Sequence, residues 1–264
     1  MLDATDFNPH FMQAGQSVYE VIRIVAGVPL FMEEHLERLS KSLNLSNQPL
    51  IISKNQIKDR TKSLIEQCAF ESGNIKLALH YHGNFPDAAA DFYAFFIRHY
   101  YPSAMEYRNG VDTITYHAIR SNPNAKVANL ELTTKVGPEI KNRQVFEAIL
   151  LDANGYITEG SRSNIFMIDG AAIFTAPLHN VLPGITRSKV LEICRQQNYP
   201  VEEKNLRPAD LAPMDALFLT GTSPNVLPIK RVDRMCFPSA ANPLLKNIMN
   251  QYDAMIAAYI KQSL

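Results

Sequence analysis

Several residue types and patterns that mark whole classes of protein are missing from this 264-residue sequence. Lysine plus arginine equals aspartate plus glutamate at 26 each, so no excess of positive charge is present to bind nucleic acid. No apolar run approaches the ~20 residues that span a bilayer. The N-terminal stretch MLDATDFNPHF lacks the basic-then-apolar pattern of a signal peptide. We therefore expect a cytoplasmic protein with neither nucleic acid nor membrane among its partners.

Cysteine is also scarce. Cys68, Cys194 and Cys236 stand far apart without a CxxC pair, which suits a reducing compartment and excludes a disulfide framework. The seven histidines are scattered, and no histidine and carboxylate cluster has ligand spacing, so we expect no metal. The patterns GxGxxG, HExxH and GxSxG and the P-loop are absent, which excludes the commonest nucleotide-binding, metalloprotease and serine-hydrolase motifs.

The residues that are present, 46% hydrophobic and 20% charged, are typical of a globular protein with a core. Strand-like and helix-like periodicities alternate in both halves of the chain, which predicts an α/β or α+β fold in two lobes. Strands are predicted at 18–25, 28–32, 74–81, 92–101, 147–152, 157–160, 163–168 and 215–222. Helices are predicted at 33–43, 54–72, 131–143 and 186–198.

The cluster RSNPNA at 120–125, rich in turn-forming residues, is the best candidate for a linker. It divides the chain into a small N-terminal α/β lobe at 1–119 and a larger lobe at 126–264. Lys126 follows the cluster directly. At a lobe junction a lysine can be partly desolvated, and burial favours the neutral amine that acts as a nucleophile. The alternative is an ordinary surface lysine.

Three further segments carry polar groups at turns. Glu159, at the end of a strand, is able to hold a protonated heterocyclic nitrogen or to lie solvated. Gly184, Ile185 and Thr186 precede a helix, where free N–H groups and a hydroxyl suit a phosphate, although Thr186 is equally suited to cap the helix. The turn LTGTSPN offers hydroxyls and N–H groups to a phosphate or carboxylate. An amine, a carboxylate and two anion cradles together are the parts of a pyridoxal phosphate site.

The predicted strand 74–81 points alternate residues to opposite faces. Its apolar face is expected in the core and consists of Ile75, Leu77, Leu79 and Tyr81. Lys76 and His80 lie on the other face and are expected to point into a cleft or into solvent. In a cleft, their charge favours a substrate with a second carboxylate, such as glutamate or the chorismate skeleton. Arg23, on the first strand, is able to add further positive charge.

Five segments then match a known family in order and spacing: SVYEVIRI with EEHLERL (17–39), KVANL (126–130), EAILLDANGYITEGSRSNIF (147–166), LPGITRSKVLE (182–192) and LFLTGTSPNVLPI (217–229). With them the chain resembles the class IV aminotransferases, the fold-type IV pyridoxal phosphate enzymes. These include branched-chain aminotransferases, D-amino acid aminotransferases and 4-amino-4-deoxychorismate lyases. The separation of Lys126 and Glu159, 159 − 126 = 33 residues, matches the family pattern.

The resemblance implies a two-lobed fold with a barrel-like β core in the larger lobe, and a homodimer whose active site borrows residues from the partner's small lobe. It implies that Lys126 bonds to pyridoxal 5′-phosphate and then moves the Cα proton, and that Glu159 pairs with the pyridine nitrogen. Cofactor phosphate contacts are implied for Arg38, Ile185, Thr186 and Thr222. With the charge argument above, substrate contacts are expected at Tyr19, Arg23, Lys76, His80, Thr222 and Ser223.

The departures from the family pattern concern specificity. Leu130 replaces the tyrosine of branched-chain enzymes, and HYHG at 80–83 stands where an Arg-Gly motif is often found. We expect transfer of an amino group between an amino acid and an α-keto acid. The alternative is 4-amino-4-deoxychorismate lyase, which releases pyruvate and 4-aminobenzoate with the same cofactor.

Overall fold

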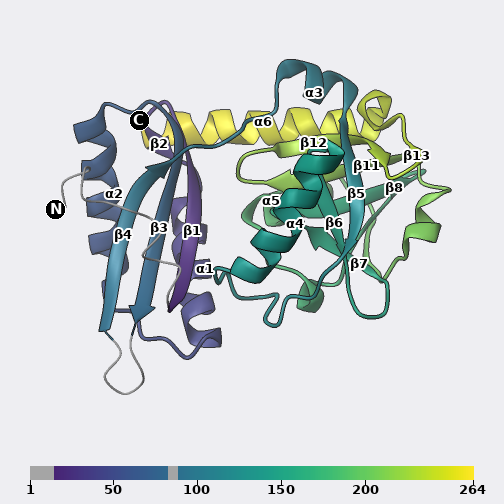
Figure 1. Ribbon diagram of the computed structural model, residues 1–264. Helices are drawn as coiled ribbons and strands as arrows, with labels where there is room; N and C mark the ends of the chain where they lie inside the picture. Colours follow the sequence, from purple (N-terminus) through teal and green to yellow (C-terminus); the bar gives the residue numbers. More distant parts are fainter. Residues whose placement is uncertain (1–14, 83–88) are drawn as a thin grey trace.

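The computed structural model describes residues 15–82 and 89–264 and is built on two β-sheets (Figure 1). As far as these residues go, the smaller sheet has four antiparallel strands in the order β2-β1-β3-β4. They are β1 (Gln16–Val25), β2 (Val28–Pro29), β3 (Ser72–His82) and β4 (Ala89–Ile97). The mixed α/β class expected from the sequence is confirmed.

Two helices, α1 (Met32–Leu45) and α2 (Lys54–Cys68), cover one face of the smaller sheet (Figure 1). Along β1, the residues that face these helices, among them Val18, Ile22 and Ile24, are fully buried. The residues that alternate with them are only half-buried, because they point to the opposite face. That second face is therefore left to form the wall of a cleft.

Within the described residues, the larger sheet has nine strands: eight in the order β10-β9-β8-β11-β12-β5-β6-β7, and β13 beside β12. They are β5 (Val111–His117), β6 (Glu147–Leu151), β7 (Ile157–Gly160), β8 (Asn164–Asp169), β9 (Ala172–Thr175), β10 (Val201–Glu203), β11 (Ala216–Gly221), β12 (Asn225–Val232) and β13 (Met235–Cys236). The edge strand β7 also contacts β8, so the sheet curls on itself. Its centre is apolar, with the buried rings of Phe166 and Phe218 stacked 5.0 Å apart.

The remaining helices are α3 (Ala104–Asn109), α4 (Leu130–Arg143), α5 (Ile185–Gln196) and α6 (Pro243–Ser263). The helix α6, yellow in Figure 1, runs from the larger sheet to the start of α1, where the rings of Phe31 and Tyr259 lie 4.9 Å apart. It thereby joins the two sheets. Across the described parts of the chain, no helix combines the length and apolarity needed to cross a membrane.

Most predicted elements are confirmed, with shifts at their ends. The strand predicted at 28–32 is correct only for Val28–Pro29, because Phe31 takes a left-handed conformation (φ 53°) and α1 begins at Met32. The helix predicted to reach residue 72 ends at Cys68, where Ala69 is left-handed (φ 47°). The strand predicted at 92–101 lies at Ala89–Ile97. The N-terminal stretch 1–11 and most of the predicted loop between β3 and β4 lie outside the described residues.

The chain passes from one sheet to the other before the predicted linker. β5, which the sequence assigns to the N-terminal lobe, pairs with β12 and β6 of the larger sheet. Residues 118–129, which follow β5, are irregular apart from one bridge between Val127 and Val18. The chain therefore leaves the smaller sheet after Ile97 and enters the larger sheet at Val111. The division into lobes at 120–125 stays a prediction.

Candidate active site

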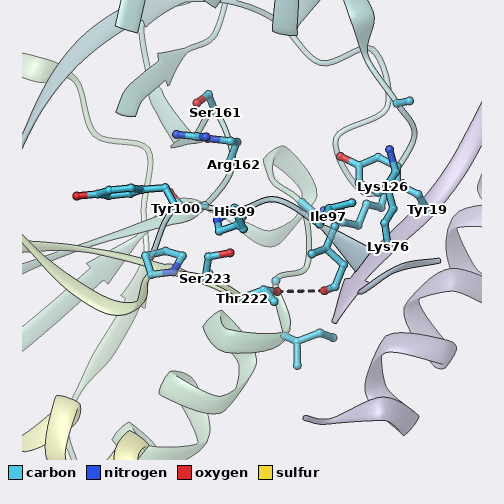
Figure 2. Close-up of a pocket in the computed structure, with 18 of the residues that line it drawn as sticks. Tyr19, Lys76, Ile97, His99, Tyr100, Lys126, Ser161, Arg162, Thr222 and Ser223 are labelled. Atoms are coloured by element: carbon cyan, nitrogen blue, oxygen red, sulfur yellow. Dashed lines mark hydrogen bonds between the residues drawn. The ribbon is translucent and has the colours of Figure 1, made fainter. Parts of the chain in front are cut away.

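A cavity of about 2270 Å³ lies between the two sheets. Its walls include the open face of the smaller sheet on one side, and the start of α5 and the turn between β11 and β12 on the other; the lining also extends to α2 and to the start of α4. Figure 2 shows side chains from both sides pointing into this space. Most of the site residues expected from the sequence line it: Tyr19, Arg38, Lys76, Lys126, Glu159, Ile185, Thr186, Thr222 and Ser223.

The backbone at Lys126 is hydrogen-bonded to the smaller sheet and to α1. The Tyr19 N–H donates to the Lys126 carbonyl (3.1 Å), and the Ala128 N–H donates to the Ser17 carbonyl (2.8 Å). The Lys126 N–H donates to the hydroxyl of Ser42, which is fully buried on α1 (3.0 Å). The Lys126 amine lies 4.8 Å from the centroid of the Tyr19 ring. The lysine is thus held on a fixed stretch of backbone with its amine in the cavity, which excludes the surface alternative.

Lys76 brings a second amine to the same ring, with its Nζ 4.6 Å from the Tyr19 centroid. Burial lowers the pKa of Lys76; Tyr19 opposes this shift, and the charge of Lys126 adds to it. The charge of Lys126 in turn lowers the pKa of Tyr19 despite burial, with help from Arg120 and Lys76. Two amines and a phenol of lowered pKa therefore share one corner of the cavity, where protons can be held and exchanged.

The two faces of β3 separate as the alternation predicts. Its apolar residues belong to the core beneath α1 and α2. On the opposite face, Lys76 lines the cavity. His80 lies on that face too, but it is buried with its Nδ1 2.9 Å from the Ser17 hydroxyl, and it takes no part in the cavity wall formed by the described residues. Of this predicted pair, only Lys76 reaches the cavity.

Glu159, at the end of β7, is a buried carboxylate in the cavity wall. Its Oε2 accepts hydrogen bonds from the Leu182 N–H (3.0 Å) and the Asn164 amide (3.3 Å). Its Oε1 lies 2.8 Å from Arg120 Nε, but the groups are not aligned, and neither atom has a hydrogen bond within the described chain. Burial raises the pKa of Glu159 above the ordinary carboxyl value, although Arg120 opposes the rise. Glu159 is therefore not solvated, and its Oε1 remains able to accept a hydrogen bond from a ligand in the cavity.

Arg120 is the site residue that the sequence analysis missed, because it lies in the predicted linker. Its Nη2 donates to the Ser161 carbonyl (3.0 Å). It stands 159 − 120 = 39 residues before Glu159, so no local pattern connects the two. They belong to neighbouring parts of one sheet, because β5 pairs with β6 and β6 pairs with β7.

Arg38, on α1, is oriented by a buried carboxylate. Its Nε and Nη2 donate to the two oxygens of Glu20 (2.8 and 2.6 Å), and its Nη1 donates to the Pro183 carbonyl (3.1 Å). His35 Nδ1 lies 2.8 Å from the same carboxylate. Burial works against the charge of Glu20, but Arg38 and His35 outweigh it and lower the pKa of Glu20 to about 2. A guanidinium has five N–H donors, so Arg38 keeps donors for a ligand in the cavity that it lines.

The helix α5 starts at the cavity wall without a side-chain cap. Its N-cap residue is Gly184, so Thr186 is not the cap, and the Thr186 hydroxyl instead lies 3.4 Å from that of Tyr252. A Cβ on Gly184 would collide with the side chain of Asn164, which explains why glycine stands at this close approach. The free N–H groups and the helix dipole make this end of α5 suitable for an anion.

The turn between β11 and β12 is held by the smaller sheet. The Asn74 amide donates to the Ser223 hydroxyl (2.9 Å), and the Thr222 hydroxyl donates to the backbone of β1 (3.4 Å). Arg23 donates to the Ser223 carbonyl (3.2 Å) and does not line the cavity wall formed by the described residues of this chain, so its expected role toward substrate stays a prediction. Thr220, in the segment LTGTSPN, has a buried hydroxyl in the wall with no partner in the described chain.

The unused hydrogen-bonding groups in the cavity wall and the Lys126 amine fit a small cofactor with a phosphate, an aldehyde and a ring nitrogen. The uncapped start of α5 and the remaining donors of Arg38 suit the phosphate. The unbonded oxygen of Glu159 suits a protonated ring nitrogen. The Lys126 amine suits the aldehyde.

Comparison with known proteins points to one family. The family model for amino-transferase class IV matches residues 17–232. A D-alanine aminotransferase from Bacillus licheniformis is 31% identical over 256 residues, which cover 93% of this chain and 89% of the relative. The crystal structure of Escherichia coli branched-chain amino acid aminotransferase superposes with a TM-score of 0.84 at 24% identity, covering 96% of this chain and 90% of that one. A candidate 4-amino-4-deoxychorismate lyase from Legionella pneumophila superposes with a TM-score of 0.81 at 22% identity, covering 91% of each chain. At such identities the two structures support the fold alone.

Proposed function

Because the chain belongs to the amino-transferase class IV family, we propose that the cavity between its two sheets holds pyridoxal 5′-phosphate. The family depends on this cofactor, and the chain is an aminotransferase that moves an amino group between an amino acid and an α-keto acid. Its similarity is to D-amino acid and branched-chain enzymes.

One observation carries the cofactor proposal. A single cavity collects the amine of Lys126, a buried oxygen of Glu159 without a hydrogen bond, and the uncapped start of α5 at Ile185. Each of these groups is incomplete in the described chain, and each matches a different part of the same cofactor. Their meeting in one place is what separates this site from an ordinary cleft.

When bound, pyridoxal phosphate supplies an aldehyde that condenses with amines and a ring that accepts electrons from the substrate Cα. Lys126 would bind the aldehyde and, once the substrate amine replaces it, carry the Cα proton as the base. Glu159 would hold the proton on the ring nitrogen. The phosphate would be bound by the side chain of Arg38, the N–H groups of α5, the hydroxyl of Thr186 and the backbone N–H of Thr222.

For the substrate, we propose that the turn at Thr222 and Ser223 binds the α-carboxylate with its N–H groups and the hydroxyl of Ser223. Tyr19 and Lys76 face the same space from the smaller sheet. Lys76 would bind a second carboxylate where the substrate has one.

We also propose that the chain acts as a homodimer in the cytoplasm. The dimer rests on the family resemblance, in which the partner's small lobe completes the site. The location is supported by the cysteines, since Cys68, Cys194 and Cys236 are all free in the structure as described.

The test of the function is an absorbance scan of the purified chain with pyridoxal phosphate and one amino donor at a time, in the absence of any keto acid. D-Alanine, leucine and glutamate are the informative donors. An aminotransferase stalls with the amino group on the cofactor, and adding an α-keto acid restores the first spectrum. The lyase alternative requires that 4-amino-4-deoxychorismate leave the spectrum unchanged while pyruvate accumulates. A chain that takes up no cofactor contradicts the proposal.

A further inference from the structure

We propose that Arg120 is a positioning residue for Glu159: it keeps this carboxylate ionised in the cavity wall and leaves one oxygen ready for a proton donor. That the donor is the cofactor's ring nitrogen rests on the proposed function. That Arg120 maintains the charge of Glu159 rests on the chain's own contacts.

Arg120 is attached to the same turn that carries Glu159. Its Nη2 donates to the carbonyl of Ser161, two residues beyond Glu159, while its Nε lies 2.8 Å from Glu159 Oε1. The pair is shielded from water, since the Arg120 side chain is 17% exposed and that of Glu159 is 3% exposed. A cation fixed at this distance in a buried place interacts strongly with the carboxylate.

The alignment of the pair leaves Glu159 Oε1 available. Arg120 Nε and Glu159 Oε1 are close but share no hydrogen bond, and neither has another partner in the described residues. The second oxygen is already occupied by the Leu182 N–H and the Asn164 amide. Arg120 therefore supplies charge beside Oε1 without forming a hydrogen bond to it.

Arg120 is the strongest of the groups that favour the ionised form of Glu159. Burial opposes ionisation, and so does the carboxylate of Glu147 on the adjoining strand β6. The Leu182 N–H and the amine of Lys126 favour it to a smaller degree than Arg120. Lys126 is the amine that the proposed reaction engages, whereas a guanidinium stays protonated throughout. Arg120 is therefore the lasting source of positive charge.

A purely structural role for this arginine gives a different expectation. As an anchor, Arg120 would tie the irregular segment 118–125 to the turn after β7, and its loss would lower stability without changing the titration of Glu159. The measurement must therefore follow the carboxylate itself.

We would record infrared difference spectra of the full chain, freed of cofactor, across a pH series and follow the carbonyl band of protonated carboxyl groups. The band that disappears in Glu159→Gln belongs to Glu159. The variants are Arg120→Gln, which removes the charge, and Arg120→Lys, which keeps it. Arg162→Gln is the matched control, because Arg162 lies in the same turn but donates to the Phe146 carbonyl.

In Arg120→Gln we expect the titration midpoint of Glu159 to rise by about one pH unit or more, since a carboxylate loses a close opposite charge. In Arg120→Lys and Arg162→Gln the midpoint stays near that of the parent chain. An unchanged midpoint in folded Arg120→Gln, checked by circular dichroism, overturns the inference. If Arg120→Gln does not fold, Arg120→Met replaces it, and the same outcome applies.

A second readout separates this inference from the proposed function. With pyridoxal phosphate bound, Arg120→Gln should show a pH-dependent change in the cofactor spectrum at a pH where the parent spectrum is constant. A chain that takes up no pyridoxal phosphate refutes the proposed function and leaves the infrared result standing. If the chain takes up the cofactor but the titration midpoint of Glu159 is the same in the parent and in Arg120→Gln, this inference alone is refuted.

Discussion

Two lysine amines lie near one aromatic ring in the cavity, at 4.6 and 4.8 Å from the centroid of Tyr19. Different parts of the chain carry the two amines. Lys76 extends from the middle of β3, whereas Lys126 stands on irregular backbone that is bonded to β1 and α1. A mutation at either position removes one amine and leaves the backbone that presents the other, so their roles can be separated by experiment.

We expect Lys126→Ala to lose the covalent bond to pyridoxal phosphate and to lower turnover by at least about 100-fold, as the loss of a general base does. Its fold should persist, because the backbone bonds at this position do not involve the side chain. Borohydride reduction of the loaded parent chain, followed by peptide mapping, should label Lys126. Lys135→Ala is the control and should keep the label. Label found on Lys135 or Lys76 in the parent would show that the lysine has been assigned wrongly.

We expect Lys76→Met to reduce the catalytic efficiency for glutamate relative to that for alanine by about tenfold to a hundredfold, the value of a partly buried charged hydrogen bond. Lys230→Met, which removes a lysine elsewhere on the cavity wall, should leave the ratio of efficiencies for glutamate and alanine unchanged.

The same contact predicts a pH dependence. Because burial lowers the pKa of Lys76, the parent's preference for glutamate should decline as pH rises, before an ordinary lysine would lose its charge. If the Lys76→Met ratio equals that of the parent, the second carboxylate is bound elsewhere.

At the scale of elements, the segment 126–128 behaves as a short extra strand beside β1, and one hydroxyl on α1 supports it. Ser42→Ala leaves the Lys126 N–H without its acceptor in a half-buried place. We expect this to lower the free energy of unfolding by about 1–3 kcal/mol, measured by urea titration. Ser40→Ala, on the same helix, removes a hydroxyl that only bonds the Leu36 carbonyl and should change stability by less than about 0.5 kcal/mol. Equal losses in the two variants would contradict the role given to Ser42.

The elements that the sequence failed to predict are of two kinds. The helix α6 was missed although its signals are local: Asn242 caps it, proline follows, and buried Leu245, Ile248 and Tyr252 recur at helical spacing. For β5 the residues are strand-like, but its membership in the larger sheet follows from pairing with β6 and β12, which are distant in sequence. No local pattern carries that information.

The same distinction holds for the site. Lys126, Glu159 and Arg38 belong to motifs that can be read along the chain, and all three line the cavity. Arg120 was missed because its role depends on a contact with a residue distant in the sequence. Arg23 lies on the half-buried face of β1, and a segment 200 residues away takes up its guanidinium. Alternation predicts the face of a strand and not which neighbours occupy it.

At the scale of the whole molecule, Arg38 connects the two sheets. It is bonded to Glu20 within the smaller unit and to the Pro183 carbonyl just ahead of α5, which packs on the larger sheet. The charge of Glu20 is therefore part of what stabilises the assembled chain. A folded-state pKa lower than the unfolded one means that this contribution is complete above the unfolded pKa and disappears as pH falls through the folded pKa.

For Glu20 those limits are an ordinary value of 4.5 and a folded value of about 2. The gap in unfolding free energy between the parent chain and Glu20→Gln should be widest above about pH 5. It should narrow by about 2 kcal/mol by pH 3 and by about 3 kcal/mol by pH 2, because protonated Glu20 resembles the glutamine. Urea titrations from about pH 7 to about pH 3 measure this gap, provided both chains remain folded without denaturant. Glu37→Gln, which removes an exposed partner of Lys54, is the control and should show a small gap. A Glu20→Gln gap that stays constant with pH would mean that the Glu20 charge contributes nothing to holding the two sheets together.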